Sequence, residues 1–130
     1  MRPKEKKILD ILLNDLQRLE DIHACGVVRR GLEGIFPSTE EFAREIMPIW
    51  DTMKATMEKL FEIIEQYSDE GLDKIYFELR DYDVMFFILP RTDTALVAIV
   101  PALANRGLLE VEMENARRRI IEIIESGNES

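Results

Sequence analysis

The chain holds one histidine and one cysteine, and these two residues lie two positions apart. His23 and Cys25 share a face if this segment is a strand, because side chains alternate along a strand. A cysteine beside a histidine can act as an activated nucleophile. Ordinary packing is the simpler interpretation, since a free cysteine behaves as a small hydrophobic residue. We therefore assign no catalytic residue and expect that the protein is not an enzyme.

Two charged clusters could bind ions. The acidic one comprises Glu62, Glu65, Asp69, Glu70 and Asp73. A divalent metal needs several oxygen ligands that converge, and a solvated acidic surface is the simpler interpretation. The basic one is the arginine triplet 117–119. Because acidic residues precede it, a charged surface face of a helix is favoured over an anion site. We expect neither a metal nor a cofactor.

Composition limits the function classes further. The 130 residues are 46% hydrophobic and 33% charged, which is typical of one globular domain over 1–130, with a fraying basic start at about 1–6 and a polar tail at about 126–130. The net charge of −9 repels phosphate backbones and argues against nucleic-acid binding. No signal peptide or membrane span is evident. We expect a cytoplasmic protein.

The segment from Leu72 to Ile124 constrains the fold most. The strand 73–80 alternates between apolar and polar residues, whereas the strands 84–89 and 95–100 are apolar on both sides and must be covered on both faces. The links between these strands are too short for parallel crossovers. The pattern predicts an antiparallel meander with helices on both faces of the sheet.

The alternating strand 73–80 is expected at a sheet edge, with one face wet or partly covered. An uncovered edge is a pairing site that proteins either block or use. Glu78 and Arg80 either guard this edge or form pairs with a symmetric copy, since antiparallel edge pairing suits a homodimer.

Three helices and two further strands complete the expected elements. The first helix covers about 4–20, and its basic first turn opposes the helix dipole, so it depends on packing. Strands follow at 23–29 and 34–36. The last helix begins after Asn105, a favourable N-cap residue. Its expected buried stripe is Leu109, Met113, Ala116, Ile120 and Ile124.

The longest helix is expected from the capping box of Ser38 and Glu41 to about Tyr67. Its main apolar stripe is Phe42, Ile46, Trp50, Met53, Met57, Leu60 and Ile64, and a weaker stripe beside it is Ile49, Thr56, Phe61 and Ile63. Two stripes call for two neighbours. Pro48 predicts a kink near 44–48, or a helix that stops and restarts there, because an interior proline costs about 3 kcal/mol.

Three motifs, in this order, resemble the roadblock/dynein light chain superfamily, which includes prokaryotic regulators of small Ras-like GTPases. They are the hairpin 24–32 (ACGVVRRGL), the helix start 39–43 (TEEFA) and the turn 104–110 (ANRGLLE). The resemblance runs from Leu9 to Ile124. The chain departs from the family pattern at a first hairpin one residue shorter, where Arg30 and Gly31 are adjacent, and at Pro48.

The resemblance implies an α/β sandwich of the α+β class, with a five-stranded antiparallel sheet in the order 2-1-5-4-3. It places the long helix on one face and the terminal helices on the other. It also implies a homodimer that joins the third strands and sets the long helices side by side. The dimer interface would then comprise Ile49, Thr56, Ile63, Ile75, Tyr76, Phe77, Glu78 and Arg80.

The resemblance further implies a small Ras-like GTPase as partner, bound on the long-helix side without a catalytic residue from this chain. The expected partner-binding residues are Arg44, Met47, Asp51, Lys54 and Glu58. A scaffold subunit of a larger complex and a small-ligand sensor are the alternatives, the latter requiring an apolar cavity against Trp50.

Overall fold

A computed structural model of the chain describes residues 3–19, 22–30, 34–35, 44, 47–89, 94–102 and 104–125. The side chains of residues 17, 34, 35, 50, 53 and 54 fall outside this description. The expectations for the capping box of Ser38 and Glu41, for the Trp50 cavity and for the polar tail therefore lie outside the described residues.

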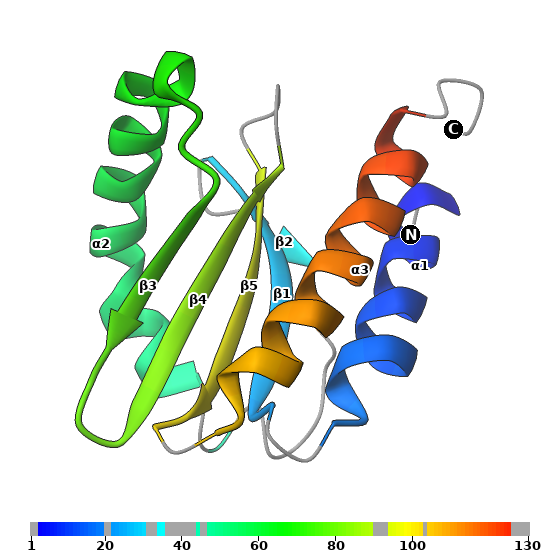
Figure 1. Cartoon of the computed structure of the whole chain (residues 1–130), viewed down its shortest axis with the longest axis horizontal. Helices are drawn as coiled ribbons and strands as arrows, with labels where there is room; N and C mark the ends of the chain where they lie inside the picture. The colour runs from blue at the N-terminus through cyan, green and yellow to red at the C-terminus, as the bar shows by residue number, and fades with distance from the viewer. Residues whose placement is uncertain are drawn as a thin grey trace.

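The fold is an antiparallel sheet between helices (Figure 1). The elements in chain order are α1 (Pro3–Ile11), the π-helix η1 (Leu12–Gln17), β1 (Ala24–Arg29), β2 (Gly34–Ile35), α2 (Met47–Gln66), the 3₁₀ turn η3 (Ser68–Glu70), β3 (Lys74–Glu78), β4 (Tyr82–Leu89), β5 (Thr94–Pro101) and α3 (Arg106–Glu125). The strands lie in the order β2-β1-β5-β4-β3, and every neighbouring pair is antiparallel. The predicted α+β class with an antiparallel sheet is confirmed.

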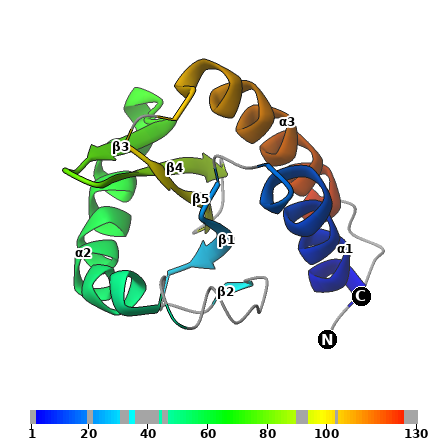
Figure 2. The same cartoon turned by 90° about the horizontal axis from the view of Figure 1, so that it is seen from below.

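The sheet lies between α2 on one side and α1 with α3 on the other, as Figure 2 shows from below. Two apolar layers join the sheet to these helices. On one face α2 contributes Met57, Leu60 and Phe61, which pack against alternate residues of β4 and β5 such as Phe86 and Val97. On the other face the core combines residues of α1, η1 and α3 with the intervening strand residues: Ile8, Ile11, Leu12, Leu16, Leu109, Met113, Ile120, Phe87, Leu89 and Leu96. Both faces of β4 and β5 are covered, which explains their apolar sequences.

The first helix is not α-helical throughout. It changes at Leu12 from α-helix to π-helix, in which hydrogen bonds run from i to i+5. Leu12 and Leu16 remain fully buried, and the Cys25 thiol donates to the Leu12 carbonyl oxygen at 3.6 Å. The first helix predicted over about 4–20 is thus helical from Pro3 to Gln17, with a change of helix type that the sequence did not indicate.

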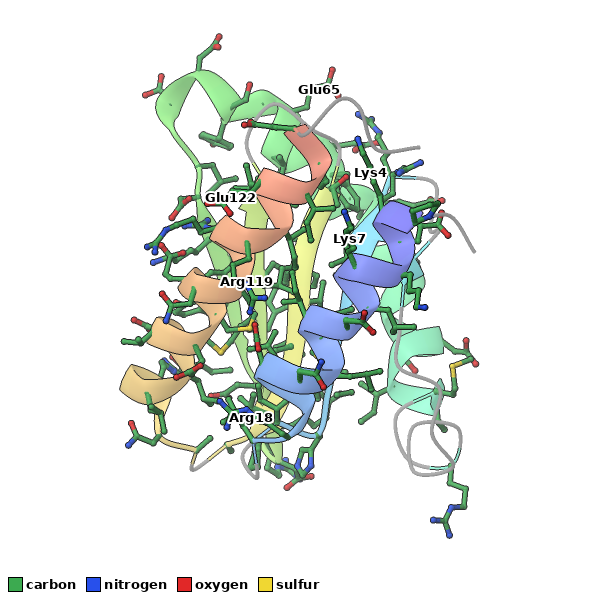
Figure 3. All side chains as sticks on the ribbon, turned by 90° about the vertical axis from the view of Figure 1, so that its right-hand side faces the viewer. Lys4, Lys7, Arg18, Glu65, Arg119 and Glu122 are labelled. Carbon is green, nitrogen blue, oxygen red and sulfur yellow. The ribbon has the colours of Figure 1, made fainter. Side chains whose placement is uncertain are left out.

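The basic first turn of α1 has a specific contact in the fold. The Lys4 ammonium donates to the carbonyl oxygen of Ile124 at 3.2 Å, and this oxygen belongs to the last turn of α3. The antiparallel packing of the two helices brings the cation to the negative end of the neighbouring helix, where it is favourable. In Figure 3, Lys4 lies beside the end of α3 in the outer helix layer.

The long helix α2 is described as α-helix from Met47, and Pro48 lies within it. The kink or restart expected near 44–48 stays a prediction. Arg44 has a π-helical pattern, and residues 45–46 lie outside the described residues. No helix in the described part of the chain is long and apolar enough to cross a membrane.

The last helix begins where Asn105 predicts. The Asn105 side-chain oxygen accepts a hydrogen bond from the Leu108 N–H at 3.2 Å, as an N-cap does. Leu109, Met113, Ala116 and Ile120 are buried, and Ile124 is half-buried.

The assignment of the arginine triplet to a surface face was wrong for Arg117. This residue is 9% exposed, and its guanidinium forms ion pairs with Asp73 and Glu114. Arg117 follows the buried Ala116 and lies on the side of α3 that faces β3, where these carboxylates compensate its burial. Arg118 is exposed, and Arg119 forms an ion pair with Asp15 of η1.

Candidate functional site

The strand β3 forms one edge of the sheet, as the alternating pattern predicts. Among the strands that the structure describes, its neighbour is β4, and no strand lies on its other side (Figure 1). The strand is shorter than the expected range and ends at Glu78, so Leu79 and Arg80 lie in the link to β4. An open edge presents backbone donors and acceptors that can pair with another strand.

The hydrogen-bond register tells which backbone groups point outward. Ile88 donates its N–H to the Asp73 carbonyl oxygen, and Leu79 donates to the Tyr82 carbonyl oxygen. Hydrogen-bonded pairs alternate along an antiparallel ladder, so Ile75 and Phe77 between these two points pair with β4. The N–H and C=O groups of Lys74, Tyr76 and Glu78 therefore face the open edge.

The side chains of β3 separate by face. Ile75 and Phe77 belong to the layer under α2, and the Phe77 ring meets Phe86 edge-on at 5.9 Å between centroids. Tyr76 points to the opposite face, where its ring stacks on Phe87 at 6.2 Å. Burial raises the pKa of Tyr76 to about 12, and a hydrogen bond to Glu110 acts in the same direction. The edge strand is thus attached to both helix layers.

One flank of α2 carries the second stripe that the sequence predicts. Ile49, Thr56 and Ile63 are spaced by seven residues, and Tyr67 follows four residues later. Ile49 is half-buried, whereas Ile63 is 39% exposed and Tyr67 is 52% exposed. Part of this stripe remains uncovered in the single chain.

The orientation of this flank follows from Glu65. Its carboxylate forms an ion pair with Arg30, next to the end of β1, at 2.7 Å. Because successive residues of an α-helix are about 100° apart, Ile63 points about 200° away from Glu65. The stripe 49/56/63 therefore lies on the flank turned away from β1, which is the flank toward β3.

The other expected set lies on the opposite flank of α2. By the same helical geometry, Met47, Asp51 and Glu58 share the side of Glu65. Asp51 and Glu58 are exposed and Met47 is half-buried. Arg44 is exposed, and the side chain of Lys54 lies outside the described residues. The fold thus separates the two predicted sets onto two flanks of one helix.

The ionic contacts between α3 and the β3–β4 hairpin were missed by the sequence reasoning. Arg106 binds Glu78 at 2.9 Å and Asp83 at 2.6 Å, and Arg117 binds Asp73 at 2.6 Å. The sequence feature that could have indicated these contacts is Asp83. An acidic residue at the start of an otherwise apolar strand needs a cationic partner if it is buried. The Asp83 side chain is 7% exposed.

The geometry favours packing over catalysis at His23 and Cys25. Burial raises the pKa of the Cys25 thiol to about 12, whereas a reactive cysteine needs a lowered pKa. His23 is exposed. Among the acidic residues, Glu62, Glu65, Asp69 and Glu70 are exposed, and in the described part of the chain no group of three or more His, Cys, Asp or Glu residues could hold a metal ion.

Comparison with known proteins identifies the fold. No family profile and no curated protein matches the sequence. Among solved structures, MglB of Myxococcus xanthus is similar with a TM-score of 0.68 and 14% identity, covering 95% of this chain and 89% of MglB. A Roadblock/LC7 domain of Streptomyces avermitilis has a TM-score of 0.61 and 14% identity, covering 85% of this chain and 91% of that domain.

A third structure, MglC of Myxococcus xanthus, has a TM-score of 0.57 and 16% identity, covering 85% of this chain and 93% of MglC. These identities are low, and the agreement lies in the arrangement of the elements. The chain has the Roadblock/LC7 fold, which it shares with MglB and MglC.

Proposed function

We propose that this chain is a non-enzymatic, homodimeric regulator or adaptor of a small Ras-like GTPase. The observation that carries the proposal is the open β3 edge beside an apolar flank of α2, in a chain with the Roadblock/LC7 fold. A second copy would extend the sheet by pairing β3 with β3 antiparallel, and it would cover the stripe 49/56/63 of α2. A structure titled as MglB in a tetrameric arrangement has the same fold.

The GTPase would bind on the α2 side of such a dimer. Asp51 and Glu58 are exposed there, on the flank that self-association would leave free, and Arg44, which precedes α2, is exposed as well. The resemblance of the sequence to GTPase regulators supports this partner class. The chain would act by holding the conformation of the GTPase or its location, without supplying a nucleophile or general base of its own.

The pairing edge is tested by removing one outward-facing donor. Tyr76→Pro deletes the N–H that faces the open edge and leaves the ladder to β4 intact. We expect the dissociation constant of the dimer to rise by at least about tenfold, which is about 1.4 kcal/mol. Sedimentation velocity measures this constant.

Tyr76→Ala is the matched control, because it removes the same ring but keeps the N–H. If the proline and alanine variants associate equally well, pairing through this edge is wrong.

The GTPase partner is tested by capture from a lysate of the native host with a non-hydrolysable GTP analogue present. We expect the wild-type chain to enrich a P-loop GTPase, and the double variant Asp51→Arg/Glu58→Arg to lose it while remaining dimeric. Asp10→Arg/Glu122→Arg makes the same charge change on the opposite helix layer and should retain the GTPase.

Two results would overturn the assignment of the partner. One is that repeated captures with the wild-type chain recover no P-loop protein, whether the lysate contains the GTP analogue or GDP. The other is equal loss in both double variants, which would mean that overall charge rather than the flank of α2 governs binding.

A further inference from the structure

Two arginines of α3 bind opposite ends of the edge strand. Near the C-terminal end of β3, Arg106 bridges Glu78 and Asp83. Just before its N-terminal end, Arg117 forms two hydrogen bonds with the Asp73 carboxylate, at 2.6 and 3.2 Å. Arg106, at the start of α3, thus contacts the end of β3, and Arg117, later in α3, contacts the residue before its start. The helix and the strand therefore run antiparallel, as Figure 1 shows.

The spacing of these contacts matches the geometry of the two elements. The eleven residues from Arg106 to Arg117 rise about 16.5 Å along a helix. The five steps from Asp73 to Glu78 rise about 16.5 Å along a strand. Both arginines can therefore hold their partners at once without distortion of either element.

Arg117 also holds the backbone at the start of the β3–β4 ladder. Its guanidinium donates to the Asp73 carbonyl oxygen at 3.3 Å and to the Ile88 carbonyl oxygen at 3.2 Å. These residues face each other where Ile88 donates its N–H to Asp73. The guanidinium lies over the Phe87 ring at 5.2 Å and its side chain is 10% exposed. One side chain thus joins α3, β4 and the beginning of β3.

Each contact joins one buried side chain to a more exposed one: Arg117 at 10% exposure binds Asp73 at 48%, and Asp83 at 7% binds Arg106 at 37%. Loss of one partner would leave an uncompensated charge at either place. The Glu78 side chain is 68% exposed, so its ion pair with Arg106 is screened by solvent. Because Arg117 also donates to the carbonyl oxygens of Asp73 and Ile88, its contact should contribute more than that of Arg106 with Asp83.

We infer that Arg117 and Arg106 form a clamp on α3 that holds β3 in the position from which the open edge pairs with a second copy of the chain. In this role both arginines are positioning residues, because neither lies at the outward-facing backbone groups. The role of the clamp in pairing rests on the proposed self-association, whereas the contacts that form the clamp lie within the single chain.

Amide-resolved hydrogen exchange separates the clamp from the pairing. The inward amides of Ile75 and Phe77 report how firmly β3 is held to β4, and the outward amides of Tyr76 and Glu78 report pairing with a second copy. We expect Arg117→Met to speed exchange of the inward amides by at least about tenfold, with unchanged exchange in β1. Protection of the outward amides should fall as well.

Four further variants control for charge, exposure and folding. Arg118→Met removes an exposed neighbouring charge, and Arg119→Met breaks the ion pair with Asp15 instead; neither should affect β3. Arg117→Lys keeps the charge without the planar fork and should give an intermediate rate. Should Arg117→Met fail to fold, Asp73→Asn tests the same tie with the arginine retained.

The outcomes distinguish the two proposals. Unchanged exchange at Ile75 and Phe77 in both Arg117→Lys and Asp73→Asn would overturn the clamp, whatever the oligomeric state. Unprotected outward amides in the wild type at every concentration would overturn the self-association, while faster inward exchange in the variants would still support the clamp.

Discussion

At the scale of single residues, the angular position of a side chain on a helix decides its burial more than its charge does. The triplet 117–119 reads as a uniform basic run, yet its members lie about 100° apart. Arg117 is buried against Asp73 and Phe87, Arg118 is exposed, and Arg119 reaches Asp15. The sequence predicted the buried stripe that includes Ala116, but it could not show that Asp73, 44 positions away, would compensate the charge of Arg117.

Cys25 gives a prediction on pH dependence. Its pKa is raised by burial from 9.0 to about 12, so the neutral thiol is favoured in the folded state. The stabilisation is complete below pH 9 and falls as the pH rises, because the unfolded chain then loses the proton first. At pH 10 the loss should be about 1 kcal/mol.

Cys25→Ala should reduce the drop in the free energy of unfolding between pH 7.5 and pH 10, as measured by urea titration at both values. Tyr76, whose pKa is also raised, contributes to the drop in both proteins and cancels in the comparison. An equal drop in wild type and variant would show that the thiol does not titrate in this way.

At the scale of elements, local signals predicted the strands and α3 well. Asn105 caps α3 as expected, and the observed β4 begins two residues before its apolar run, whereas β5 extends one residue beyond its run at each end. The π-helix η1 was not predictable, since Leu12 and Leu16 suit an α-helical stripe equally well. The full length of the long helix, with its start at Ser38, lies outside the described residues.

The cap of α3 offers a test of an element boundary. Asn105→Ala removes the acceptor of the Leu108 N–H, and we expect it to lower the free energy of unfolding by about 1 kcal/mol. Asn105→Ser, which keeps a capping oxygen, should cost less. Thermal or urea denaturation measures both, and equal costs for alanine and serine would argue that the cap contributes nothing.

At the scale of the whole molecule, alternation in one strand and two doubly apolar strands predicted a covered meander with β3 at an edge. The apolar strands also predicted helices on both faces, but which helix lies on which face came from the family resemblance. No local pattern indicated the contacts that charged side chains make with distant partners, such as Arg106 with Asp83 and Lys4 with the carbonyl oxygen of Ile124.

The central claim is that the open edge of β3 and the exposed flank of α2 meet a second copy of the chain. The mass of the wild-type protein at micromolar concentration, measured by sedimentation equilibrium, tests it most directly. We predict a species of twice the 15.2 kDa chain mass that dissociates on dilution. A monomer throughout the micromolar range would contradict the proposal.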